Sequence, residues 1–266
     1  MHRFVALGDS FTEGLHDEVG ADQRHLGWAD RVAAALAQEH DGIDYANLAV
    51  RGRLLDQVID EQIAPALRLA PDLVSFHAGG NDVLRPGVDL SQLAAAYDRA
   101  VGTLRSDGAQ VVLFTVLEGV GRDDPLARWL ATHIARFNAE VVRPAAARHD
   151  AALVDVGGCA ALHDARLWHE DRLHLGPAGH RRVAAAVLDT LGVPDPHAPG
   201  RAPGWWAQPL PAPPAAGPVT RGLTDLRWAR RHLAPWILRR VRGVSSGDAV
   251  TAKRAEPLPL PPRTTG

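Results

Sequence analysis

Hydrophobic positions form two alternating kinds of run up to about residue 192. Short uninterrupted apolar runs are typical of strands buried on both faces, and they occur at Arg3–Leu7, Ile43–Leu48, Leu73–Phe76, Val111–Thr115 and Leu153–Val156. Longer stretches with helical periodicity lie between and after them, at Trp28–Glu39, Leu54–Leu69, Leu90–Leu104, Pro125–Arg148 and Pro177–Leu191. Strands that alternate with helices predict an α/β fold with a five-stranded parallel sheet covered on both faces.

The pattern changes after this region, which predicts a body at 1-192 and a tail at 193-266. Residues 194–218 are rich in Pro, Ala and Gly, as in an extended linker. Apolar residues at helical spacing, with arginines between them, predict a basic amphipathic helix at about 222-242 that Pro235 bends. The proline-rich stretch from Glu256 to Gly266 predicts a disordered end.

Charge separates the same two regions. The net charge is -2, which argues against a general affinity for nucleic acid. The tail carries 11 basic and 4 acidic residues, whereas the body carries 18 and 27. We therefore expect the tail helix to dock on the acidic body. Two alternatives are peripheral contact with an anionic membrane, which the arginines with Trp228 and Trp236 would suit, and a disordered tail.

Other sequence features bear on the compartment. A single cysteine, Cys159, excludes an internal disulfide. The chain shows no secretory signal and no apolar run of the roughly 18–20 residues that span a bilayer. We therefore expect a soluble, cytoplasmic protein, and the sequence gives no indication of its oligomeric state.

The end of the first predicted strand carries the leading chemical candidate. Gly8-Asp9-Ser10 follows the apolar run directly, which places a serine hydroxyl on a tight turn at the sheet edge. Acyl transfer by serine needs a nucleophile, a base, a group that orients the base, and donors for the oxyanion. Ser10 is the candidate nucleophile, and Asp171 and His174, three residues apart in a turn, are the candidate orienter and base. Asp9 is expected to shape the turn rather than to react.

Two loops that follow other strands offer the donors. Gly52 has a backbone N–H that no side chain blocks, and Asn81, within Gly79-Gly80-Asn81-Asp82, has a side-chain amide. In a parallel sheet, these loops open at the carboxyl ends of the strands, where open α/β sheets place their sites.

The chain thus carries four short motifs in sequence order, which are Gly8-Asp9-Ser10, Gly52, Gly79-Gly80-Asn81-Asp82 and the pair Asp171 and His174. Together and in this order, they resemble the four blocks of the SGNH/GDSL hydrolase family over residues 1 to about 192. The resemblance implies a flavodoxin-like three-layer α/β/α fold and a serine esterase activity. The sequence does not reveal the ester, and we expect hydrolysis of a carboxylic ester with a small or short-chain acyl group through an acyl-enzyme. The resemblance also implies an oxyanion hole made by the Ser10 and Gly52 N–H groups and the Asn81 side chain. Phe11 stands where the family's first block has leucine, and the basic tail lies outside the resemblance.

Two other functions stay open on this sequence. An acyltransferase would use the same acyl-enzyme with an alcohol in place of water. A membrane-surface or partner-binding protein would use the α/β domain only as a scaffold, although the full catalytic set argues against it. We expect a small-molecule ester as the partner and no cofactor.

Several further residues have two readings. His77 and Trp168 could contact substrate, or could be a structural histidine and a core tryptophan. Glu170 follows His169, but the interval to His174 is one residue too long for the H-E-x-x-H zinc motif, so we expect no metal site. His180 is expected to face solvent. Ser245 lies in a G-x-S-x-G pattern but lacks a downstream histidine, which predicts a loop.

Overall fold

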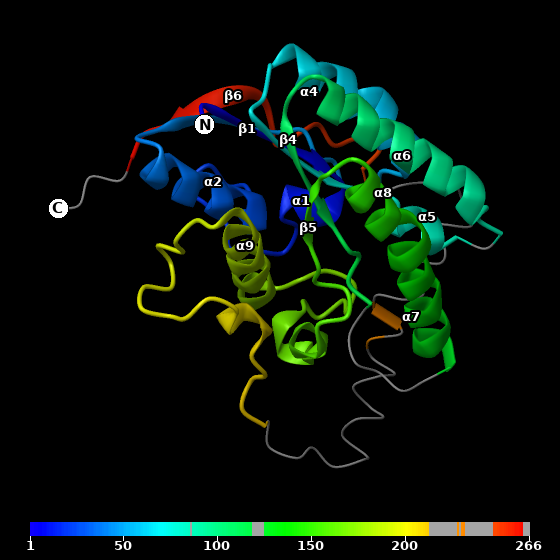
Figure 1. The fold of residues 1–266 in the computed structure, drawn as a ribbon. Coiled ribbons are helices and arrows are strands. Elements are labelled where there is room, and N and C mark those ends of the chain that lie inside the picture. Colours follow the sequence, from blue (N-terminus) through cyan, green and yellow to red (C-terminus); the bar gives the residue numbers. More distant parts are fainter. Residues whose placement is uncertain (86, 119–124, 213–227, 229, 232–246, 263–266) are drawn as a thin grey trace.

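The protein is built around one mostly parallel β-sheet (Figure 1). The computed structural model describes residues 1–266 except 86, 119–124, 213–227, 229, 232–246 and 263–266. The strands are β1 (Arg3–Gly8), β2 (Ile43–Asn47), β3 (Leu73–His77), β4 (Gln110–Phe114), β5 (Ala152–Val154) and β6 (Arg254–Leu260), in the order β5-β4-β3-β1-β2-β6. Strands β1 to β5 pair in parallel and confirm the five predicted strands, whereas β6 is antiparallel to β2.

Helices cover both faces of the sheet, as the alternating pattern predicted (Figure 1). Helices α2 (Gly27–Glu39) and α9 (Pro177–Leu191) pack together on one face. The other face is covered by α3 (Leu55–Val58), α4 (Ala64–Arg68), α6 (Leu90–Ser106), α7 (Pro125–Phe137) and α8 (Arg143–Arg148). Two short helices, α1 (Ser10–Glu13) and α5 (Gly80–Val83), follow β1 and β3 directly. The predicted three-layer α/β/α architecture is confirmed.

Prolines interrupt two of the predicted helices without ending them. Pro65 and Pro144 lie in the first turns of α4 and α8, and each follows a π-helical turn, Ile59–Ile63 and Asn138–Val142 respectively. A wider turn before proline accommodates its missing N–H and its ring.

The strand β6 corrects two expectations, because the sheet has six strands rather than five and residues 254–260 are ordered rather than part of a disordered end. Pro257 and Pro259 alternate along β6, so the residues between them keep their N–H groups, and an edge strand tolerates such prolines. The Lys253 ammonium fixes the start of this strand. It lies 2.6 Å from a carboxylate oxygen of Asp30 and 2.8 Å from the carbonyl oxygens of His25 and Leu26.

The described parts of the tail contact the body. The indole N–H of Trp206 donates to Asp189 of α9 over 2.9 Å, and the Arg182 guanidinium lies 2.7 Å from the carbonyl oxygen of Gln208. The predicted helix at about 222-242 lies outside the described residues, except for Trp228, Arg230 and Arg231. Within the described part of the chain, no helix has the length and apolarity needed to cross a membrane.

His180 is buried rather than exposed, contrary to expectation. It is 1% exposed inside α9, and its Nε2 lies 3.2 Å from the carbonyl oxygen of Leu15. Burial lowers the pKa of this imidazole to about 4. The sequence pattern understated how much of α9 is covered, because α2 and the loop after α1 both pack on it.

Candidate active site

The topology brings three loops to one place. The chain leaves β1 for β2 on one side and later returns to β3 on the other, which makes the carboxyl ends of these strands a topological switch point. Ser10 follows β1, Gly52 follows β2, and Asn81 follows β3. The three residues assigned to nucleophile and donors thus come from three adjacent strands.

The turn before Ser10 depends on a glycine. Gly8 has a φ of +149°, and a Cβ at this position would collide with the carbonyl oxygen of His77. The buried amide of Gln62 holds the same residue, since it accepts from the Gly8 N–H at 2.8 Å and donates to its carbonyl at 2.9 Å. Asp9 then caps α1 by accepting from the Phe11 N–H. As expected, Asp9 shapes the turn, and Ser10 begins the helix.

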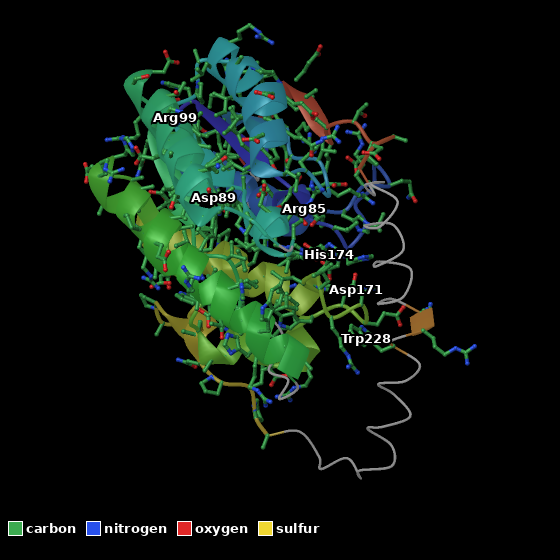
Figure 2. The ribbon with its side chains drawn as sticks, turned by 90° about the vertical axis from the view of Figure 1, so that its right-hand side faces the viewer. Arg85, Asp89, Arg99, Asp171, His174 and Trp228 are labelled. Atoms are coloured by element: carbon green, nitrogen blue, oxygen red, sulfur yellow. The ribbon has the colours of Figure 1, made fainter. Side chains whose placement is uncertain are left out.

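The structure brings Ser10, His174 and Asp171 into one chain of hydrogen bonds. The Nε2 atom of His174 lies 3.1 Å from Ser10 Oγ, and Nδ1 lies 2.7 Å from Asp171 Oδ2. Asp171 and His174 lie close together in Figure 2, in the loop that precedes α9. This is the order of contacts that a serine, a base and an orienting carboxylate require.

The Asp171 carboxylate has fixed partners on both oxygens. Its Oδ1 accepts from the backbone N–H groups of Leu173 and His174, both at 3.0 Å. Burial alone would raise the pKa of Asp171, but hydrogen bonds from His16 and His174 and from the Leu173 N–H outweigh it. The pKa therefore lies well below its usual value, and the carboxylate stays ionised.

Two further histidines surround this carboxylate. His16 Nε2 and His169 Nδ1 each lie 3.3 Å from Asp171 Oδ2, and the two rings stack in parallel with centroids 3.7 Å apart. Burial and the neighbouring His16 lower the pKa of His169. His16 adopts a φ of +68°, a left-handed conformation that is uncommon for a residue with a Cβ.

Of the described residues, His16, His169 and Asp171 come nearest to a metal-binding group, with potential ligand atoms within 4.8 Å of one another. Imidazole binds a metal through a lone pair in its ring plane. Two parallel stacked rings therefore cannot both direct their lone pairs at one ion unless a ring rotates.

The proposed oxyanion donors are linked through Asn81. Its Nδ2 atom lies 3.2 Å from Asp9 Oδ2 and 3.1 Å from the carbonyl oxygen of Arg53. Asp9 precedes Ser10 and Arg53 follows Gly52, so one amide joins the loops after β1 and β2. Gly52 has a φ of +76°, which glycine adopts freely. The Ser10 N–H is the first of α1, and such groups have no partner within their own helix.

The family follows from comparison with known proteins. Residues 6–182 match the model of the GDSL-like Lipase/Acylhydrolase family. The chain belongs to this family. The expected membership is thereby confirmed, and the chain is a hydrolase of carboxylic esters. No curated protein matches its sequence.

Solved structures of similar fold agree with this family. TesA is 23% identical, with 71% of this chain and 98% of that chain covered and a TM-score of 0.57. The acetylxylan esterase Axe2 from Geobacillus stearothermophilus is 22% identical, with 73% and 95% covered and a TM-score of 0.57. An alpha/beta hydrolase enzyme from the metagenome of Lake Arreo, Spain, is 22% identical, with 72% and 95% covered and a TM-score of 0.58. At these identities the likeness shows the shared fold.

His77 and Trp168, the two residues considered for substrate contact in this hydrolase, both make contacts with other side chains or backbone groups of the protein. His77 is 5% exposed, and its ring packs on Phe11 with centroids 4.3 Å apart. Trp168 is half-buried, and its indole N–H donates to the carbonyl oxygen of Leu162 over 2.7 Å. Both observations favour the packing alternative for these side chains.

Sequence reasoning did not single out several residues of this site. His16 has no local signal, because only the fold brings it to Asp171. Gln62 lies on a helical stretch like any other polar residue, and its contact with Gly8 spans 54 positions. Trp228 was considered only as an aromatic residue of the basic tail that would suit a membrane surface, yet its indole N–H donates to the Asp171 carbonyl oxygen.

Asp82 gives a test of electrostatics beside the site. Burial raises its pKa to about 6. As pH rises, Asp82 therefore loses its proton at lower pH in the unfolded chain than in the folded protein. Its ionisation thus lowers the free energy of unfolding between about pH 4 and about pH 6. We expect Asp82→Asn, which can still accept from the Leu55 N–H, to raise that free energy at pH 8 by ~1–3 kcal/mol.

Urea unfolding of both proteins at pH 4 and pH 8 measures this effect. The gain should disappear at pH 4, and the exposed Asp107→Asn should show no gain at either pH. An Asp82→Asn protein with the same gain at both pH values would contradict the assigned pKa.

Proposed function

We propose that this chain is a serine esterase that cleaves a carboxylic ester through a Ser10-His174-Asp171 triad and an acyl-enzyme. The observation that carries the proposal is the pair of contacts made by His174, at 3.1 Å to Ser10 Oγ and 2.7 Å to Asp171 Oδ2. Each ring nitrogen thus faces the group that its role requires, in a family whose members hydrolyse acyl esters.

In the first half of the reaction, Ser10 Oγ attacks the ester carbonyl carbon while His174 Nε2 takes the hydroxyl proton. Asp171 holds the other ring nitrogen protonated and stabilises the imidazolium that forms. The Ser10 and Gly52 N–H groups and the Asn81 amide donate to the oxyanion. Asn81 must then turn one N–H from Asp9 or Arg53 toward the substrate.

The second half regenerates the enzyme. The tetrahedral intermediate collapses, the C–O bond to the alcohol breaks, and His174 gives its proton to the leaving oxygen. A water molecule then attacks the acyl-enzyme while His174 takes its proton, and the acid leaves as Ser10 recovers its hydrogen.

The surroundings of the triad favour a small acyl group. His16 and His169 each place a ring nitrogen 3.3 Å from the Asp171 carboxylate, so polar groups surround this side of the triad. A long alkyl chain would gain little by displacing water from these groups, whereas an acetyl group needs no apolar channel. Axe2, which shares the fold, is described as an acetylxylan esterase.

Two measurements test the proposal together. We expect the purified protein to react covalently with a fluorophosphonate probe at a single site, and to hydrolyse 4-nitrophenyl acetate with a higher kcat/KM than the octanoate ester. An unlabelled but folded protein would overturn the serine mechanism. A higher kcat/KM for the octanoate ester would overturn only the proposed preference for a small acyl group.

A further inference from the structure

One tryptophan of the tail lies against the turn that carries Asp171 and His174 (Figure 2). The Nε1–H of Trp228 donates to the carbonyl oxygen of Asp171 over 2.9 Å. The guanidinium carbon of Arg172 lies 5.0 Å from the centre of a Trp228 ring, a cation–π arrangement. A residue far beyond the family match at 6–182 therefore holds two consecutive residues of the catalytic turn.

The turn has a conformation that needs support. Arg172 has a φ of +57°, in the left-handed region that residues with a Cβ rarely adopt. Such conformations persist where surrounding contacts hold them. This conformation also lets Asp171 Oδ1 accept from the Leu173 and His174 N–H groups, which aims Oδ2 at His174. Trp228 contacts the carbonyl group of Asp171 and the side chain of Arg172, the two residues joined by the peptide bond that leads into Arg172.

A nearby ion pair makes only a small contribution. Arg231 Nη2 lies 3.3 Å from Glu170 Oε1, but the two side chains are 72% and 54% exposed. Exposed pairs of this kind contribute little, because water screens them and both side chains lose freedom. Among the described residues of the tail, the Trp228 indole therefore makes the stronger contact with the turn.

We propose that Trp228 is a positioning residue that, in the serine mechanism proposed above, keeps Asp171 directed at His174. Without the indole, the Asp171 carbonyl bonds to water and Arg172 relaxes toward negative φ, which rotates the carboxylate away from the imidazole. The base then spends less time in contact with Ser10. The loss falls on kcat and on the reactivity of Ser10 rather than on substrate binding.

The matched pair Trp228→Phe and Trp206→Phe tests this assignment. Both residues are half-buried tail tryptophans whose indole N–H bonds the body, but Trp206 bonds to Asp189 on α9, away from the triad. The rate of fluorophosphonate labelling and the kcat and KM for 4-nitrophenyl acetate are measured on each full chain. Rates are expressed per site that labels at the end point, so that misfolded protein does not count.

We expect Trp228→Phe to lower kcat and the labelling rate by about tenfold each, with KM within about twofold of wild type. Trp206→Phe should retain wild-type values for all three. An unchanged kcat in Trp228→Phe, or an equal loss in Trp206→Phe, would overturn the positioning role. A rise in KM that grows with acyl length at constant kcat would also overturn it and make Trp228 a pocket wall.

A double variant tests the link to backbone strain. Glycine adopts a φ of +57° freely, so Arg172→Gly removes the need for support. In that background we expect Trp228→Phe to cost no more than about threefold in kcat. The same tenfold loss in both backgrounds would contradict the mechanism. Failure of the wild-type chain to label at all would instead contradict the serine mechanism, so the two failures are distinguishable.

Discussion

Ser10→Ala is expected to lower kcat for 4-nitrophenyl acetate by at least ~10⁴-fold and to abolish fluorophosphonate labelling. The hydroxyl is the group that forms the bond to the acyl carbon, and His174 Nε2, 3.1 Å away, would have no proton to take. The change removes one oxygen at the start of α1 and leaves the Asp9 cap in place, so the melting temperature should stay near that of wild type.

Ser245→Ala is the informative control for this experiment. Its G-x-S-x-G context matches the nucleophile pattern of another hydrolase fold, so it is the rival candidate in the sequence. We expect full activity and full labelling. Loss of labelling in Ser245→Ala with retention in Ser10→Ala would reverse the assignment.

Asp171→Asn should have the next largest effect, a fall in kcat of about 10³–10⁴-fold with little change in KM. An asparagine can present its N–H to His174 Nδ1, which favours the tautomer with the proton on Nε2, and that nitrogen can then no longer accept from Ser10. It also removes the negative charge that the contacts of Asp171 keep ionised. Steady-state kinetics on 4-nitrophenyl acetate measures the loss.

A control for Asp171→Asn lies a few residues earlier in the same loop. Asp164 accepts from the Arg166 N–H at 2.9 Å and caps a short 3₁₀ turn, a role that asparagine can also fill. Asp164→Asn should therefore keep wild-type kcat. If both variants lost activity equally, the effect of Asp171→Asn would reflect the order of the loop rather than the tautomer of His174.

The parts of this protein that were predictable from sequence are those with local signals. The five parallel strands each show as an apolar run, and Gly8 and Ser10 lie at the end of the first. The spacing of Asp171 and His174 confines both to one turn, so their contact needs no knowledge of the rest of the fold. Which loops share a sheet edge then follows from parallel pairing.

The parts that were not predictable depend on contacts between distant segments. Pairing of Tyr45 with Leu258 joins residues that no local pattern relates, and the prolines of β6 read as disorder until an edge strand is known to accept them. Trp228 and Asp171 are 57 positions apart, and His16 reaches Asp171 from the other end of the chain. Burial of His180 likewise required knowing what packs over α9.

The late position of β6 has a consequence for synthesis of the chain. About 200 residues separate β2 from the strand that covers its open edge. At ribosomal rates of roughly 5–20 residues per second, β2 waits about 10–40 s for this partner. An uncovered strand edge is a template for pairing with other chains. During this interval, the open edge of β2 can pair wrongly with the same strand of another newly made molecule on a neighbouring ribosome. The length of the chain between β2 and β6 determines how long the interval lasts.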